Sequence, residues 1–103
     1  MKPKIETKKG WTEVVIDDAC GFEKFYRVAE VLQREFKLTF TNKLDHLDSL
    51  YWDFDYKECT LTLHYNIYAG VTLFPKAFKE ATPADNGSAE EIGTLLFQEL
   101  NQE

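Results

Sequence analysis

Apolar and polar positions alternate with a period of two in the middle of the chain. From Leu50 to Tyr56, and again from Thr60 to Tyr68, every second residue is a large apolar side chain. Such alternation is typical of strands that bury only one face of a sheet. We therefore expect two antiparallel strands here, followed by a third strand that ends at Pro75, because proline cannot donate to the ladder.

The same pattern predicts the register of the first hairpin. A two-residue turn at Lys57-Glu58 places Phe54 opposite Leu61 and Trp52 opposite Leu63, so that the apolar side chains share one face. Lys-Glu is a poor sequence for this tight turn, and a looser loop is the alternative.

In the second hairpin, the pattern favours a three-residue loop at 68–70. This loop pairs Ile67 with Val71 and needs a left-handed residue at Gly70. The predicted core face of the three strands then consists of Leu50, Trp52, Phe54, Tyr56, Leu61, Leu63, Tyr65, Ile67, Val71 and Leu73.

Two segments have helical periodicity instead. Apolar residues recur at steps of three and four from Phe22 to Phe36, which predicts an amphipathic helix. A capping box at Ser88–Glu91 predicts the start of a second helix, and Gly93 inside it indicates close packing at that point. One helical turn is expected within 76–81, and an irregular connection at 82–87.

Short strands are expected at 11–17 and 38–41, with a polar loop at 42–49. The order defines an α+β two-layer sandwich (β-α-β-β-β-β-α), with a mainly antiparallel sheet and two amphipathic helices packed on one face. The 103 residues suffice for one domain. We assign it to residues 11–103 and expect residues 1–10 to be a flexible basic tail.

The charge narrows the choice of partners. The net charge is −6, but the first ten residues carry four lysines and one glutamate, so the remaining 93 carry −9. An acidic body repels nucleic acid and anionic membranes and attracts a basic partner. No apolar run reaches the ~20 residues of a spanning helix, and no signal peptide is visible, so we expect a cytoplasmic protein.

Motifs for catalysis or cofactor binding are absent from the sequence, so we expect no cofactor and no enzymatic activity. Cys20, His46, Cys59 and His64 lack the spacing of a zinc site, and the segment Asp45–Asp48 is only a weak metal signal. The two cysteines are expected to be free thiols in a reducing compartment, and a disulfide between them is the alternative.

The face opposite the predicted core is the candidate functional surface. Its large aromatics lie among carboxylates, which is typical of a protein-binding surface. A merely solvated face is the simpler interpretation. The candidate binding residues are Tyr51, Asp53, Asp55, His64, Tyr68 and Phe74, with Asp45 and Asp48 at the edge.

Two alternatives to protein binding remain open at this point. Asp53 lies diagonal to His64, where it would raise the pKa of the imidazole, so the two could form the acid/base pair of an enzyme. The domain could instead be a homodimer, joined through an exposed sheet edge or through this same face.

The segments 50–56, 61–66 and 70–75 resemble small, uncharacterised bacterial protein families of about this length. More loosely, the chain is similar to the immunity proteins of bacterial toxin systems, which are often small acidic α+β domains. That resemblance implies a protein that binds and blocks a toxin, frequently a basic nuclease. It transfers no catalytic residue.

Overall fold

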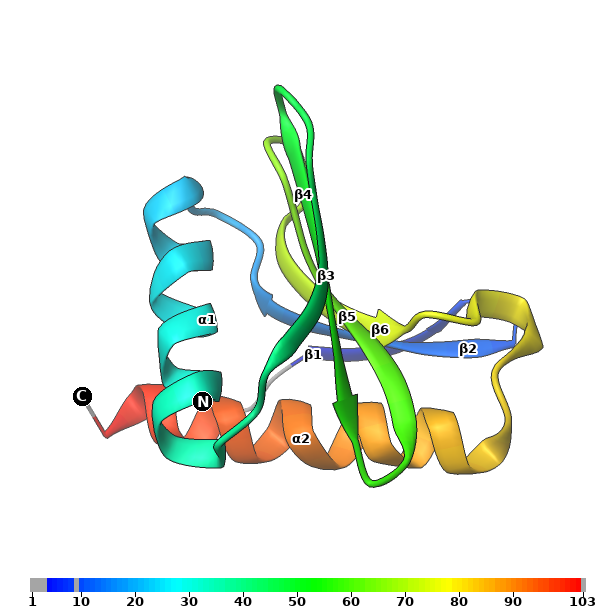
Figure 1. The fold of residues 1–103 in the computed structure, drawn as a ribbon. Helices are drawn as coiled ribbons and strands as arrows, with labels where there is room; N and C mark the ends of the chain where they lie inside the picture. Colours follow the sequence, from blue (N-terminus) through cyan, green and yellow to red (C-terminus); the bar gives the residue numbers. More distant parts are fainter. Residues whose placement is uncertain (1–3, 9, 103) are drawn as a thin grey trace.

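A computed structural model describes residues 4–8 and 10–102 as a six-stranded antiparallel sheet with two helices on one face (Figure 1). The strand order is β1-β2-β6-β5-β4-β3. The elements along the chain are β1 (Lys4–Lys8), β2 (Trp11–Asp17), α1 (Phe22–Phe36), β3 (Phe40–Asp45), β4 (Ser49–Tyr56), β5 (Cys59–Asn66), β6 (Gly70–Pro75), the short 3-10 helix η1 (Phe78–Glu80) and α2 (Pro83–Asn101). The predicted α+β sandwich is confirmed.

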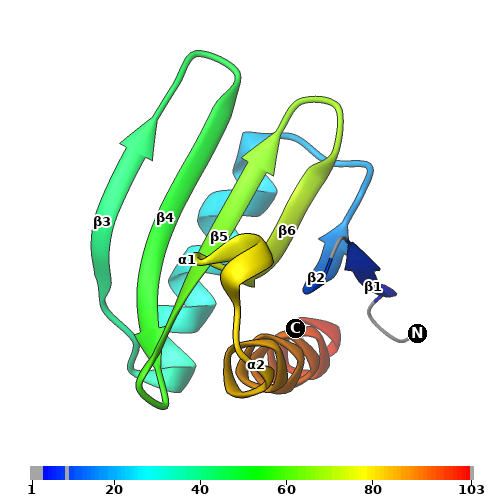
Figure 2. The ribbon, with the colours of Figure 1, turned by 90° about the vertical axis from the view of Figure 1, so that its right-hand side faces the viewer.

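The two helices divide the covered face between them. α2 packs against β2, β6 and β5, and α1 packs against β5 and α2. In Figure 2, α1 lies behind the sheet, whereas η1 lies in front of it, over β5 and β6. The side chains under the helices form the core, and Phe54, Leu61, Leu63 and Leu73 have no exposed surface.

Close helix–sheet packing at Gly93 is confirmed. A Cβ atom at this position would lie 2.7 Å from Cγ1 of Val14 on β2. Only the absence of a side chain lets α2 approach the sheet this closely.

The predicted register of β4 and β5 is confirmed. Phe54 pairs with Leu61 and Trp52 with Leu63. Lys57 and Glu58 form the tight turn, with φ values of 51° and 66°. Both residues therefore have the left-handed conformation of a type I′ turn, so the looser loop is wrong. The cross-strand pairs fix this turn despite its unfavourable residues.

The second hairpin differs from the prediction. Its loop comprises residues 67–69, Asn66 pairs with Gly70, and Tyr65 pairs with Val71. Ile67 consequently leaves the core face and is 47% exposed. Gly70 is nevertheless required, because its φ is 75° and a Cβ atom would lie 2.0 Å from the carbonyl oxygen of Asp17.

The N-terminal segment is not the expected tail. Residues Lys4–Lys8 form β1, an edge strand in which Ile5 pairs with Val14 of β2. One apolar residue between charged neighbours is too short a pattern to predict a strand. Residues 1–3 and 9, also part of the predicted tail, lie outside the described residues.

Two element boundaries were also predicted incorrectly. β3 extends to Asp45 through the segment expected to be a loop, because an edge strand needs no alternating apolar face. α2 begins at Pro83, and Thr82 and Asp85 form its capping box. The Ser88–Glu91 sequence lies inside the helix, so the first of two similar motifs, which is followed by proline, is the true start.

Candidate binding site on the outer sheet face

The face of the sheet opposite α1 and α2, here called the outer face, has a hollow of about 390 Å³. Strands β3, β4 and β5 provide its floor, and the segment after β6 closes one side. We call it the outer hollow. Its lining consists of Asn42, Leu44, His46, Tyr51, Asp53, Thr62, Lys76 and Phe78.

A buried carboxylate lies at the base of the outer hollow. Asp53 is only 5% exposed, and its two oxygens accept bonds from β3, from β5 and from the segment after β6. The Thr62 hydroxyl donates to Oδ1 over 2.6 Å, Lys76 Nζ lies 2.8 Å from Oδ2, and Asn42 Nδ2 lies 3.4 Å from the same oxygen. Burial alone would raise the pKa of Asp53, but the bonds from Lys76, Thr62 and Asn42 outweigh it and lower the pKa below its ordinary value.

Lys76, the cation of this ion pair, is far more exposed to water than Asp53, the anion. The Lys76 side chain is 55% exposed, whereas that of Asp53 is 7% exposed. Lys76 follows Pro75, and its backbone N–H donates to the carbonyl of Thr60 over 3.1 Å. The backbone is therefore anchored to β5, while the ammonium group remains in contact with water.

Aromatic rings form a continuous chain across the outer face. Successive contacts join His46, Tyr51, His64, Phe74, Phe78 and Trp11. The closest is the stack of Tyr51 on His64, with centroids 4.5 Å apart. These side chains come from the β3–β4 loop, β4, β5, β6, η1 and β2. The chain of rings therefore links the end of β3 to β2.

His64 lies in the middle of these rings and is half-buried. Its Nδ1 lies 3.2 Å from the Thr72 hydroxyl. Its Nε2 is one of two buried side-chain nitrogens that have no hydrogen-bond partner within the described part of the chain; the other is Nε1 of Trp11. Burial lowers the pKa of His64, and the opposing carboxylate is Glu13, not Asp53. The expectation that Asp53 raises this pKa is therefore wrong.

Of the predicted site residues, only some lie together at the hollow. Tyr51 and Asp53 line it, whereas His64 does not. Phe74 is 4% exposed and is packed between rings, so it is not an accessible contact. Asp55 is exposed on the same face and accepts a 2.8 Å bond from Thr60.

The remaining predicted residues lie at one end of the sheet. Tyr68 is 85% exposed in the β5–β6 loop. Asp48 is in the neighbouring β3–β4 loop, and its carbonyl accepts a 3.3 Å bond from the Ile67 N–H. Asp45 accepts a 2.7 Å bond from Trp52 Nε1 on the helix-covered side, so it does not border the outer face as expected.

Sequence reasoning missed several residues of this face. Lys76 and Phe78 follow the last strand and carry no periodic signal, and Asn42 and Leu44 were placed in a loop. The alternation in residues 11–17 could have placed Trp11 on the outer face, had the pairing of β2 with β6 been known.

Neither a metal centre nor a disulfide is found within residues 4–8 and 10–102. No group of three or more His, Cys, Asp or Glu side chains is arranged there to hold a metal ion. Cys20 and Cys59 are both free thiols, and burial raises the pKa of Cys20. In the same part of the chain, no helix has the length and apolar character needed to cross a membrane.

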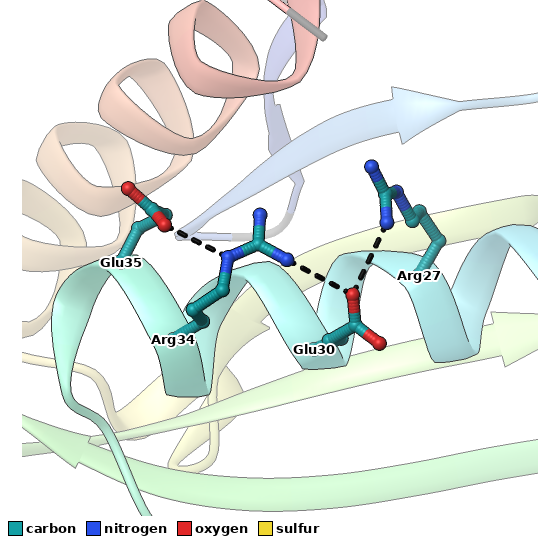
Figure 3. A network of polar contacts seen from close by, with 4 residues as sticks. All are labelled: Arg27, Glu30, Arg34 and Glu35. Carbon is teal, nitrogen blue, oxygen red and sulfur yellow. Dashed lines mark hydrogen bonds and ion pairs between the residues drawn. The ribbon is translucent and has the colours of Figure 1, made fainter.

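Charged side chains on α1 form a separate surface network (Figure 3). Glu30 accepts bonds from Arg27 and Arg34, over 3.1 Å and 3.0 Å, and Arg34 also contacts Glu35. The hydrogen bond from Arg34 lowers the pKa of Glu35. All four side chains are well exposed, and pairs of this kind contribute little to stability.

Fold and site together define a small α+β domain with one helix-covered sheet face and one open face. The chain matches a family model described as "Protein of unknown function (DUF3630)" over residues 3–100. It therefore belongs to this family, which confirms the expected kinship with an uncharacterised protein family. The comparisons do not show the looser resemblance to immunity proteins. Curated proteins and solved structures gave no significant match.

Proposed function

We propose that the protein is a non-enzymatic binding module whose outer face takes a basic segment of a partner protein. The observation that carries this proposal is the buried carboxylate of Asp53 at the base of the outer hollow, paired with a half-exposed lysine. A cytoplasmic setting is part of the proposal, and an immunity-like role is the version in which the partner is a basic toxin.

The chemistry of the hollow favours a cationic side chain. Asp53 already holds an ammonium group 2.8 Å away, and Lys76 loses little when it returns to water. Tyr51 and Phe78 provide rings at the walls, and a guanidinium group bonds a carboxylate and stacks on aromatic faces at the same time. An arginine of the partner could therefore replace Lys76 on Asp53.

Long-range electrostatics support the same class of partner. The net charge of −6 attracts a basic protein and increases the rate of encounter at low salt. Asp55 adds an exposed carboxylate beside the hollow.

The enzymatic alternative receives no comparable support. Asp53 bonds to Thr62, Asn42 and Lys76, and the hydrogen-bond partner of His64 is Thr72. A general acid/base pair needs the two groups to share a proton or a substrate.

Site-specific photo-crosslinking in a cell lysate, at a series of salt concentrations, tests the proposal. A photoreactive phenylalanine at Tyr51 should capture a basic protein, with a yield that falls as salt is raised. The matched control is the same residue at Tyr26, which is 49% exposed on α1. Identical adducts at both positions would count against the outer face.

With the captured partner purified, two substitutions test the role of Asp53. Asp53→Asn should weaken binding by at least tenfold. Lys76→Met should strengthen it, because it removes the internal competitor. Lys79→Met, on the adjacent η1, is the control for the loss of one positive charge. Equal affinity for the Lys76→Met and Lys79→Met variants would contradict the displacement of Lys76.

A further inference from the structure

Strand β3 is an edge of the sheet with unusual exposure. Five of its six residues are exposed, and among the strands of the described residues it pairs only with β4. Figure 2 shows no helix or loop outside β3, along the whole length of the strand. An uncovered edge presents a row of backbone groups that can pair with another strand.

The hairpin geometry shows which backbone groups are available. The His46 N–H donates to the Ser49 carbonyl over 2.8 Å, and Asp45 pairs with Leu50. Because hydrogen-bonded and non-bonded pairs alternate in an antiparallel ladder, Leu44 also bonds to β4. The N–H and C=O groups of Lys43 and Asp45 then point away from β4, toward the open edge.

We propose that two copies of this chain associate as a homodimer through antiparallel pairing of β3 with β3. Leu44 lies opposite Leu44 of the second copy, at the two-fold axis. The interface is centred on the free edge of β3 and borders the outer hollow only at Leu44, so this inference goes beyond the proposed function.

The charges of β3 select this register. With Leu44 on the axis, Lys43 of each copy forms a hydrogen-bonded pair with Asp45 of the other. The two adjacent registers that use the same backbone groups place Lys43 opposite Lys43, or Asp45 opposite Asp45. Like charges directly opposite one another destabilise a sheet, and opposite charges stabilise it.

Trp52 contacts the side chains of both Lys43 and Asp45 on the helix-covered side of the sheet. Lys43 Nζ lies 4.3 Å from the centroid of the Trp52 ring, and Asp45 Oδ1 accepts from its Nε1 over 2.7 Å. These contacts restrict the two side chains before association, which reduces the entropy lost on pairing.

Pairing also buries the apolar residue on the other side of the strand. Leu44 is 50% exposed and lines the outer hollow where the hollow meets the free edge of β3. In a non-hydrogen-bonded pair the two Leu44 side chains approach closely. Each copy would thus extend the wall of the other copy's hollow.

The other edge of the sheet is a poorer candidate. β1 contains charged residues at three of its five positions, compared with two of six in β3, and charged residues on an edge strand discourage pairing unless the register places opposite charges together. Pairing of β1 with β3 would also continue from copy to copy into a filament, whereas β3 with β3 closes at two copies.

Disulfide trapping tests the register directly. Leu44→Cys should form a covalent dimer under mild oxidation, because this position faces itself across the axis. Asn42→Cys, two residues away on the same strand, should not, since it faces position 46 of the second copy. The wild type controls for its own thiols, Cys20 and Cys59.

Light scattering tests whether the charges of Lys43 and Asp45 stabilise the dimer. The wild type should have twice the mass of the 12.0 kDa chain, Lys43→Asp should dissociate to monomers, and the double variant Lys43→Asp/Asp45→Lys should recover the dimer. A wild type that stays monomeric up to millimolar concentration, or equal trapping of Leu44→Cys and Asn42→Cys, would overturn the proposal. Capture of a partner at Tyr51 by monomers would leave the proposed function intact and remove only the dimer.

Discussion

The two faces of this sheet are built from alternate residues of the same strands, yet they achieve burial differently. On the helix-covered face, Phe54 and Leu63 are sealed by α1 and α2 and have no exposed surface. On the outer face, Asp53, Thr62 and Thr72 are nearly as buried, although neither α1 nor α2 covers them. Neighbouring side chains provide their cover, and hydrogen bonds offset the cost of removing them from water.

A sheet face whose sequence is polar can therefore be shielded from water by its own neighbouring side chains. Helix-covered burial depends on shape, so the loss of volume is costly there. Burial on the outer face depends on specific partners, so the loss of one partner should matter more than the loss of volume. The following five predictions test this contrast.

The largest effect is expected for Phe54→Ala, compared with Phe74→Ala on the outer face. Phe54 is completely enclosed, so its truncation should cost about 3–5 kcal/mol in the free energy of unfolding. Phe74 contacts Phe78, which is 43% exposed and free to relax, so its truncation should cost less. Urea denaturation measures both. Equal costs would show that the two faces are packed alike.

Gly93→Ala probes the closeness of α2 to the covered face. The new Cβ would meet the Val14 side chain at 2.7 Å, and such overpacking should cost about 1–3 kcal/mol. The control is Gly87→Ala on the same helix, where no atom lies within 4 Å of the new Cβ. Thermal melts should show a gain of up to about 1 kcal/mol for this control. A stabilised Gly93→Ala variant would refute the close packing.

A comparison of Asp53→Ala with Asp55→Ala tests whether the stability of the outer face depends on buried hydrogen-bond partners. Removal of Asp53 leaves the Thr62 hydroxyl without its acceptor and should cost about 1–3 kcal/mol, whereas Asp55→Ala should change stability by less than about 0.5 kcal/mol.

The pH dependence of unfolding adds a second measure of Asp53. Because folding lowers its pKa, its contribution is present above the unfolded pKa of about 4 and is lost as the pH falls through the folded value. Denaturation at pH 7 and pH 3 should therefore show a smaller penalty for Asp53→Ala in acid. A penalty that does not change with pH would contradict a charged, paired Asp53.

The smallest effect is expected at His64. Burial lowers its pKa, so the unfolded chain binds the proton more readily than the folded one does. Stability from this group is present above the unfolded pKa of about 6.5 and declines as the pH falls toward the folded value. His64→Gln should flatten that part of the stability curve between pH 7 and pH 5. If the slope of the stability curve did not change in this variant, a group other than His64 would be responsible for it.

Sequence patterning predicted the β4–β5 pair and α1 well, because each buries one face with the period of its own structure. It missed β1 and predicted only the first two residues of β3; these two edge strands have little apolar periodicity and depend on a neighbour for pairing. It identified Tyr51 and Asp53 as site residues, but not Lys76 or Phe78, which reach the hollow from a segment after the last strand.

The amino-acid sequence by itself determined which side of β4 and β5 faces the core, since a shift by one residue would expose every apolar side chain. Only the tertiary structure decided that Asp53 is buried and paired, that Lys76 is its cation, and that β3 is left open. These features depend on contacts between residues that are distant along the chain. The periodicity of apolar residues within one segment carries no information about such contacts.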